Sequence, residues 1–264
     1  MPHQVHMQAM TGAFALLLLV VTVWFAYLLA ALWQMQRQAG WPTWRLASFT
    51  CGTALLVAAL SPPLMSWGHV DLRGHMAQHL TLGMFAPIAL MLGKPVSLLL
   101  RSVPVSLARG IAILLASPPA RVLTHPFAAL LLDVGALYLL YMTPLYQLSL
   151  SNPGLHVWLH LHFILAGYLF CWAIAGPDPA PHRGTFHTRL AALFLATAAH
   201  SILSKLMYGY GYPRDAGHGL AEIEVAAQLM YYGGNLAEMV LALLLFAGWY
   251  REAGRRVPAA VMNR

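Results

Sequence analysis

The sequence predicts an all-α integral membrane protein, a seven-transmembrane-helix bundle that forms a single polytopic domain over residues 1–264. Three observations carry this prediction. Hydrophobic residues make up 59% of the chain and charged residues only 9%, whereas soluble domains carry roughly 25% charged residues. Apolar runs recur with about the ~20 residues that a helix needs to cross a bilayer. The basic residues gather in alternate connections between these runs, as expected when they fix the orientation in a membrane.

The apolar runs give the predicted spans: 12–34, 46–65, 75–92, 127–146, 156–175, 187–208 and 225–249. No Lys or Arg precedes the first run and no small-residue cleavage site follows it, so we expect a retained span there. The stretch between the third and fourth spans is apolar only in short pieces, broken by Pro104, Pro118 and Pro119. This pattern is typical of an interfacial helix that lies on the membrane.

The distribution of Lys and Arg predicts the orientation. Only Arg73, Lys205 and Arg214 fall on one side of the predicted topology, and the other twelve of the fifteen basic residues fall on the opposite side. We therefore expect the N-terminus outside and the C-terminus in the cytoplasm, with an odd number of spans. The net charge of +7 is explained by this asymmetry. No basic patch with interleaved aromatic residues indicates binding to nucleic acid.

Ten of the thirteen histidines fall outside or in the outer halves of the predicted spans. His75 and His79 are four residues apart at the start of the third span, and His156 and His160 repeat this spacing in the fifth. Residues four apart share one helix face, and two imidazoles at that spacing can bind one metal ion. His200 lies two turns inside the outer end of the sixth span. We expect both pairs to face the bundle interior and, with His200, to bind metal.

The type of metal follows from the ligands. Imidazole suits copper, zinc, iron and nickel, and thioethers favour Cu(I). The N-terminal segment combines both ligand types, and one methionine accompanies the third-span pair, which adds accessory candidates: His3, His6, Met7, Met10 and Met76. Copper is therefore the favoured metal. The alternatives are that these histidines are ordinary interfacial residues, or that His79 and His160 ligate a b-type haem from facing helices. No CxxCH motif for covalent haem is present.

Other polar residues interrupt the apolar runs, namely Asp133, Lys205, Asn235 and Glu238. Such residues either hydrogen-bond between helices or mark a path for protons or ions. Glu222, Glu224 and Gln228 lie at the outer end of the last span, where they either join a metal site or remain surface groups. Cys51 and Cys171 lie inside apolar runs and indicate no disulfide framework. No hydrolase or nucleotide-binding motif is present, so we expect no enzyme.

Two segments resemble a known family. The stretch HMAQHLTLGMFAPIALMLGKP, residues 75–95, resembles the signature of the CtaG-type (caa3-type) cytochrome c oxidase assembly factors, and HVWLHLHFILAGYLFCWAIAGPDP, residues 156–179, is similar to the same family's fifth span. The last span departs from the family pattern. Many members have an Asp-Gln pair and a Met-Trp there, where this chain has EVAAQLMYYGGNLAE.

The resemblance implies a multi-pass protein of the bacterial inner membrane that helps to mature a haem-copper oxidase through copper delivery. Its expected partners are oxidase subunits, other copper chaperones and membrane lipid. The outward-facing His and Met residues agree with a periplasmic copper supply. Three other functions stay open: a haem-binding or haem-handling protein, a transporter of copper or protons, and a scaffold that holds oxidase subunits together.

Overall fold

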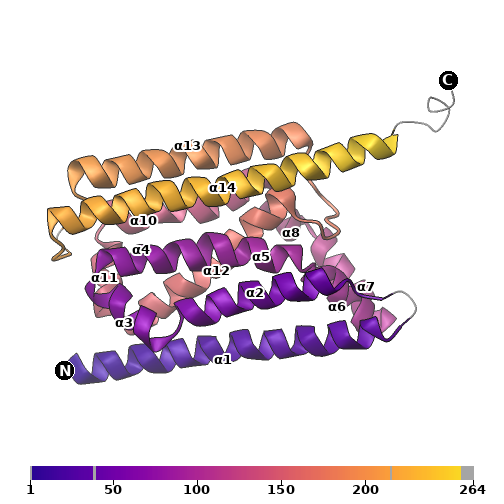
Figure 1. Ribbon diagram of the computed structural model, residues 1–264, viewed down its shortest axis with the longest axis horizontal. Coiled ribbons are helices and arrows are strands. Elements are labelled where there is room, and N and C mark those ends of the chain that lie inside the picture. Colours follow the sequence, from indigo (N-terminus) through magenta and orange to yellow (C-terminus); the bar gives the residue numbers. More distant parts are fainter. Residues whose placement is uncertain (1, 38–39, 215, 257–264) are drawn as a thin grey trace.

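The computed structural model describes residues 2–37, 40–214 and 216–256, with the backbone alone for residues 2–11, 13 and 255–256. Within this part of the chain every regular element is a helix, and no strand occurs. Figure 1 shows the helices packed side by side along one long axis. The prediction of an all-helical bundle is confirmed.

Four helices are long and apolar enough to cross a membrane. Each lacks an internal proline, so its backbone hydrogen bonds continue without a break. They are α1 (Pro2–Met35), α12 (Pro153–Ala175), α13 (Phe186–Tyr210) and α14 (Leu220–Arg256). α1 begins well before the predicted span, because the polar segment in front of residue 12 continues the same helix.

Three further candidate spans are bent pairs of helices. α2 (Thr43–Ala59) leads into α3 (Pro62–Val70) with a bend of 53°. The run α4 (Leu72–Leu80), η1 (Thr81–Phe85) and α5 (Ala86–Leu92) bends by 46° into α6 (Pro95–Ser102). The run α9 (Pro126–Leu130), η2 (Leu131–Gly135) and α10 (Ala136–Met142) bends by 80° into α11 (Leu145–Ser151).

A proline stands at each bend, where it ends one helix and begins the next. Pro62 and Pro95 occupy the first helical positions of α3 and α6, and Pro144 precedes α11. The predicted spans 46–65 and 127–146 therefore run past the real helix ends. The described residues hold four candidate spans, or up to seven if each bent pair counts as one.

The proline-broken stretch after α6 forms α7 (Val105–Ala116) and α8 (Pro118–Leu123). α7 has 12 residues, which is about 18 Å of helix and too short for a ~30 Å hydrocarbon core. It buries none of its side chains. Several are large and apolar and more than half exposed, namely Val105, Leu107, Ile113 and Leu114.

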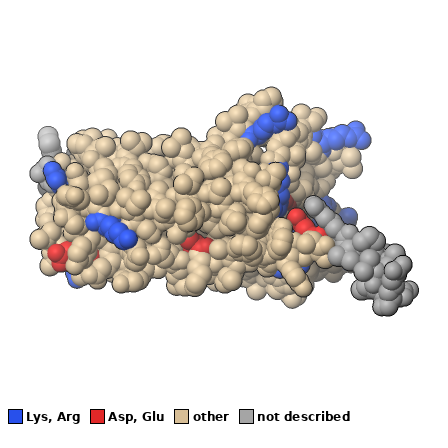
Figure 2. Space-filling view, turned by 90° about the horizontal axis from the view of Figure 1, so that it is seen from above, with Lys and Arg blue, Asp and Glu red and all other residues tan. Residues whose placement is uncertain are grey.

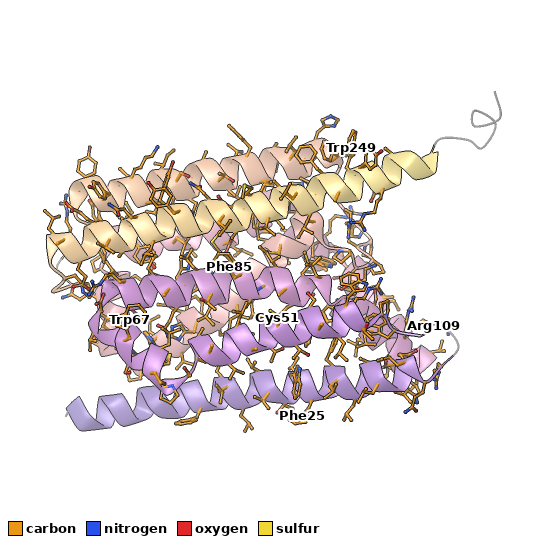
Figure 3. All side chains as sticks on the ribbon, in the orientation of Figure 1. Phe25, Cys51, Trp67, Phe85, Arg109 and Trp249 are labelled. Carbon is orange, nitrogen blue, oxygen red and sulfur yellow. The ribbon has the colours of Figure 1, made fainter. Side chains whose placement is uncertain are left out.

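Apolar side chains cover much of the outside of the bundle. Phe25 of α1 and Trp249 of α14 project away from it (Figure 3), and about half of each side chain is exposed. Lys and Arg side chains concentrate at the end where the chain leaves α14, while the middle of the visible face carries few charges (Figure 2). An apolar belt between polar ends is what a membrane requires of a protein that crosses it.

Asp178, in the Gly-x-Asp-Pro turn after α12, connects two helices of the bundle. Asp178 is buried, and it accepts hydrogen bonds from the backbone N–H of Val96 and of Ser97 and from the Ser97 hydroxyl. These N–H groups belong to the first turn of α6, where they have no partner within the helix. Asp178 thus caps α6 and joins it to α12.

Candidate functional site

The five predicted metal ligands are all buried inside the bundle. His75 and His79 lie on α4, His156 and His160 on α12, and His200 on α13, and none of the five is more than 3% exposed. The expectation that both i,i+4 pairs face the interior agrees with these positions. Because a buried imidazole needs polar partners, the surroundings of each ring decide what it can do.

Four histidines form the first set, which we call the outer cluster: His69, His75, His156 and His160. The rings of His156 and His160 lie 4.4 Å apart between centroids, and the ring of His69 lies 4.2 Å from that of His156. His75 is within electrostatic range of His69, His156 and His160. His69 belongs to α3, which folds back against α4. The outer cluster therefore unites three helices.

His79 and His200 form a second set, the inner pair. Their ring centroids are 6.3 Å apart, and His79 lies one turn further along α4 than His75. The His200 ring lies against Gly234 of α14, so closely that a Cβ atom there would overlap it. The second glycine of the Gly-Gly sequence in α14 thus makes the room for His200. A small residue at this position lets α13 and α14 approach closely.

Five of these six imidazoles have at least one buried ring nitrogen without a hydrogen-bond partner. Both ring nitrogens of His75, His79 and His200 are buried without one, as are Nε2 of His156 and Nε2 of His160. Native proteins leave few buried polar groups unsatisfied, and such groups call for an explanation. The rings do not converge on a single point, however. Among the described residues, no group of three or more His, Cys, Asp or Glu side chains is arranged to hold one metal ion.

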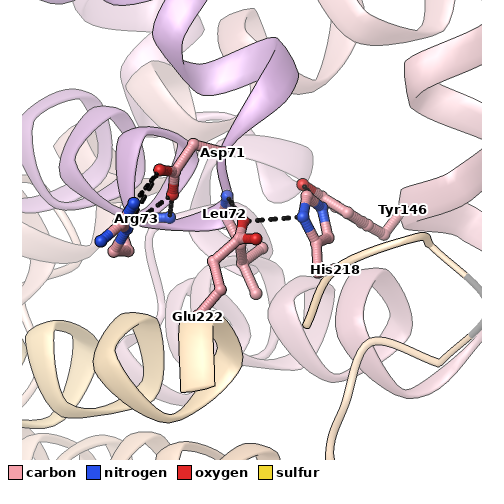
Figure 4. A network of polar contacts seen from close by, with 6 residues as sticks. All are labelled: Asp71, Leu72, Arg73, Tyr146, His218 and Glu222. Atoms are coloured by element: carbon pink, nitrogen blue, oxygen red, sulfur yellow. Dashed lines mark hydrogen bonds and ion pairs between the residues drawn. The ribbon is translucent and has the colours of Figure 1, made fainter. Parts of the chain in front are cut away.

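A polar network joins the start of α4, α11 and the start of α14 (Figure 4). Glu222 of α14 accepts a hydrogen bond from the backbone N–H of Leu72 at 2.5 Å, and its carboxyl oxygen lies 2.7 Å from Nδ1 of His218. Nε2 of His218 is 3.1 Å from the hydroxyl of Tyr146 on α11. The Tyr146 ring in turn meets the His75 ring edge-on at 4.9 Å. Contacts therefore run from the end of the bundle to the outer cluster.

Asp71 and Arg73 flank this network at the start of α4. Asp71 accepts the backbone N–H of Arg73 and pairs with its guanidinium at 2.5 Å. The guanidinium hydrogen bonds hold the pKa of the Asp71 carboxyl well below its usual range. A carboxylate at the N-terminus of a helix also interacts favourably with the helix dipole. The pair therefore fixes the turn from which His75 and His79 extend.

Met76, the accessory candidate on α4, is fully buried, and its sulfur lies 4.0 Å from the hydroxyl of Tyr141. The Tyr141 ring also borders His75, with the centroids 6.0 Å apart. Met76 is thus connected to the outer cluster through Tyr141. The side chains of the other accessory candidates, His3, His6, Met7 and Met10, lie outside the described residues.

The intramembrane polar residues separate into two groups. Asp133 and Glu238 line one small cavity in the middle of the bundle. Asn235 accepts a hydrogen bond from the Ser201 hydroxyl and so joins α13 to α14. Lys205 is exposed on α13, with its ammonium 5.5 Å from the centroid of the Tyr231 ring. The last two residues thus link the helices or interact at the surface.

The remaining sequence candidates occupy different places. Glu222 belongs to the polar network of Figure 4. Glu224 is partly buried, and Gln228 is exposed beside a groove between α13 and α14. His162 points away from the clusters, as expected for a residue two positions after His160. Its Nε2 lies 2.9 Å from the carbonyl oxygen of Leu132.

Sequence reasoning missed His69 and Tyr146. His69 lies between the predicted spans 46–65 and 75–92, and only the folding of α3 against α4 brings it to His156. The signal was present in Gly68 and Gly74, because a Cβ at Gly68 would meet the Gln78 side chain and one at Gly74 would meet Trp67. Two glycines on either side of a turn indicate helices that pack closely. Tyr146 gave no comparable signal.

Residues 23–252 match the sequence model of the cytochrome c oxidase caa3 assembly factors (Caa3_CtaG). The chain belongs to this family. The matched region runs from α1 to the last turns of α14, so it includes all the histidines of the outer cluster and the inner pair. The family resemblance of residues 75–95 and 156–179 is thereby confirmed.

Similar curated proteins come from mycobacteria. An uncharacterized protein of Mycobacterium leprae is 35% identical over 174 residues, which cover 62% of this chain and 26% of the relative. An uncharacterized protein of Mycobacterium bovis is 35% identical over 189 residues, which cover 69% of this chain and 28% of the relative. The chain thus spans about a quarter of the length of these relatives. No solved structure matches.

Proposed function

We propose that this member of the caa3 oxidase assembly factor family binds copper in its buried histidines and helps to deliver it to a subunit of a haem-copper oxidase. One observation carries the proposal. Eight imidazole nitrogens on α4, α12 and α13 are buried without hydrogen-bond partners. Hydrocarbon surroundings make such groups costly, and a neutral imidazole has one nitrogen lone pair that it can donate to a metal ion.

The histidines would bind the ion after their rings rotate. The outer cluster and the inner pair do not surround one point, so coordination requires rearrangement of side chains. The rings of His75, His79 and His200 have no hydrogen bond that holds them in place. A site of this kind suits a protein that must pass its metal on. Ligand exchange needs coordination that can be opened, which a rigid cage of four ligands would resist.

The direction of delivery follows from the proposed topology. We place the outer cluster at the periplasmic face of a bacterial inner membrane, with seven spans and a cytoplasmic C-terminus. The twelve-to-three distribution of basic residues supports this orientation. The outer network, which connects Glu222, His218 and Tyr146 to His75, then lies where copper arrives.

Copper binding is tested with purified protein in detergent. Anaerobic titration with Cu(I) against a chromophoric chelator gives the affinity of the wild type and of His79→Ala and His160→Ala. We expect each variant to lose at least tenfold in affinity, because one imidazole ligand is replaced by a methyl group that cannot coordinate the ion. His187→Ala is the matched control, since His187 is exposed at the other end of α13 from the inner pair. Equal affinity in all four proteins would overturn the assignment.

Delivery is tested in cells that make a copper-containing oxidase. His79→Ala and His160→Ala should lower the copper content of the oxidase at limiting copper, with normal amounts of the assembly factor in the membrane. Added copper should partly restore it, because occupancy depends on metal concentration relative to the dissociation constant. A Soret band in the purified protein, lost in the same variants, would instead assign these histidines to haem.

A further inference from the structure

A second candidate site lies next to the inner pair, because Gly83, which lines it, also borders the His79 ring. A cavity of about 10 Å³ is lined by three groups that can carry a proton, Asp133, Cys171 and Glu238. They come from η2, α12 and α14. A cavity of this volume has room for about one water molecule. The remaining lining residues are apolar or glycine, namely Gly83, Met84, Ile88, Phe170, Ala237 and Leu241.

The backbone around the cavity is unusual in two places. η1 supplies Gly83 and Met84, and η2 supplies Asp133. Both segments are single π-helical turns inside longer helices. Such turns are rare and occur frequently at functional sites. Two π turns from different helices line this one cavity, which favours a functional site there. In η2 the carbonyl oxygen of Leu132 lies within hydrogen-bond distance of Nε2 of His162.

The carboxyl groups are placed where two negative charges would be costly. Glu238 is only 4% exposed, and its Oε2 is buried without a hydrogen-bond partner. The hydroxyl of Thr197 on the neighbouring α13 donates to the carbonyl of Leu193, and Asp133 is within electrostatic range of Glu238. The described residues that line the cavity include no Lys or Arg to balance a charge. A carboxylate in hydrocarbon is stable only with a counter-charge or after it takes up a proton.

We propose that Asp133 and Glu238 form a proton-binding site, in which the carboxyl pair holds one exchangeable proton beside a single water molecule. The proton enters as an O–H bond on one carboxyl oxygen, and the pair then carries one negative charge instead of two. Cys171 is the other titratable group at the cavity, and Tyr138 of α10 is excluded because its hydroxyl donates to the carbonyl of Ala199. The site is independent of copper binding by the histidines.

Infrared spectroscopy of the metal-free, full-length protein tests this site. A protonated carboxyl group has a C=O stretch that is separate from the bands of carboxylates and shifts in heavy water. We expect this band at neutral pH in the wild type, with its loss in Glu238→Gln or Asp133→Asn and a shift in heavy water. Asp71→Asn is the control, because Asp71 is ionised beside Arg73 and should not contribute.

The band can also be assigned without any variant, so the test does not require that the variants fold. Wild-type protein that carries isotope-labelled carboxyl carbons in Asp alone, or in Glu alone, assigns the band without any substitution. The proposal is wrong if no protonated-carboxyl band exists at neutral pH, if neither label shifts it, or if heavy water leaves it unchanged. The last result would mean a sealed structural carboxyl group rather than a proton-binding site.

Discussion

Gly234 offers a direct test of the packing around the inner pair. A methyl group at this position would overlap the His200 ring, and forced overpacking typically costs about 1–3 kcal/mol. Replacing glycine by alanine inside a helix also contributes about 1 kcal/mol of stability. Gly234→Ala should therefore range from neutral to about 2 kcal/mol less stable than the wild type, by combination of these two effects.

Gly248→Ala is the matched control in the same helix. Nothing lies within 4 Å of a Cβ at Gly248, so this substitution should only gain helix propensity. Equilibrium unfolding of both purified variants in the same detergent gives the difference between them. The gain in helix propensity is the same in both variants and cancels. We therefore expect Gly234→Ala to be the less stable of the two by about 1–3 kcal/mol, which is the cost of overpacking.

A double variant decides whether His200 is the group that clashes. Removing the imidazole in Gly234→Ala/His200→Ala should cancel most of the difference, because the new methyl group then has space. The interaction energy in this cycle should be at least 0.5 kcal/mol, as is usual for residues in contact. Strict additivity of the two substitutions would falsify the placement of His200 against α14.

Three more outcomes follow. A reporter fused after Arg264 should be active only in the cytoplasm, and one inserted after Asn152 only outside; the reverse result would invert the proposed orientation. Asp178→Asn should lower the free energy of unfolding by about 1–3 kcal/mol, since charge-assisted hydrogen bonds to α6 are weakened; an unchanged unfolding curve would contradict this capping role. Arg73 lowers the pKa of Asp71 in the folded protein. The small stabilisation that the Asp71–Arg73 pair provides should therefore be present above roughly pH 4 and be lost as the pH falls further. High salt should reduce that contribution, which acid unfolding of Asp71→Asn at two ionic strengths would show.

Much of the fold could be predicted because membrane proteins obey strong local constraints. Apolar runs, charge deficit and helix periodicity indicated the long helices, and α12 and α13 begin and end within a few residues of prediction. The i,i+4 spacing placed His75 with His79 and His156 with His160 on shared faces, and both pairs are buried. The bends were not predicted, because a proline marks a break without giving the angle at which the chain continues.

The sequence by itself determined that the chain is a helical membrane protein, that its histidines gather toward one end and that it resembles the oxidase assembly factors. Only the tertiary structure decided which side chains meet. His69 approaches His156 because α3 folds back on α4, and Asp133 and Glu238 share a cavity although 105 positions separate them in the chain. The physical reason is the range of the interactions. Hydropathy and helix periodicity act within one segment, whereas a site is made by contacts between helices that small residues, prolines and π turns allow to approach.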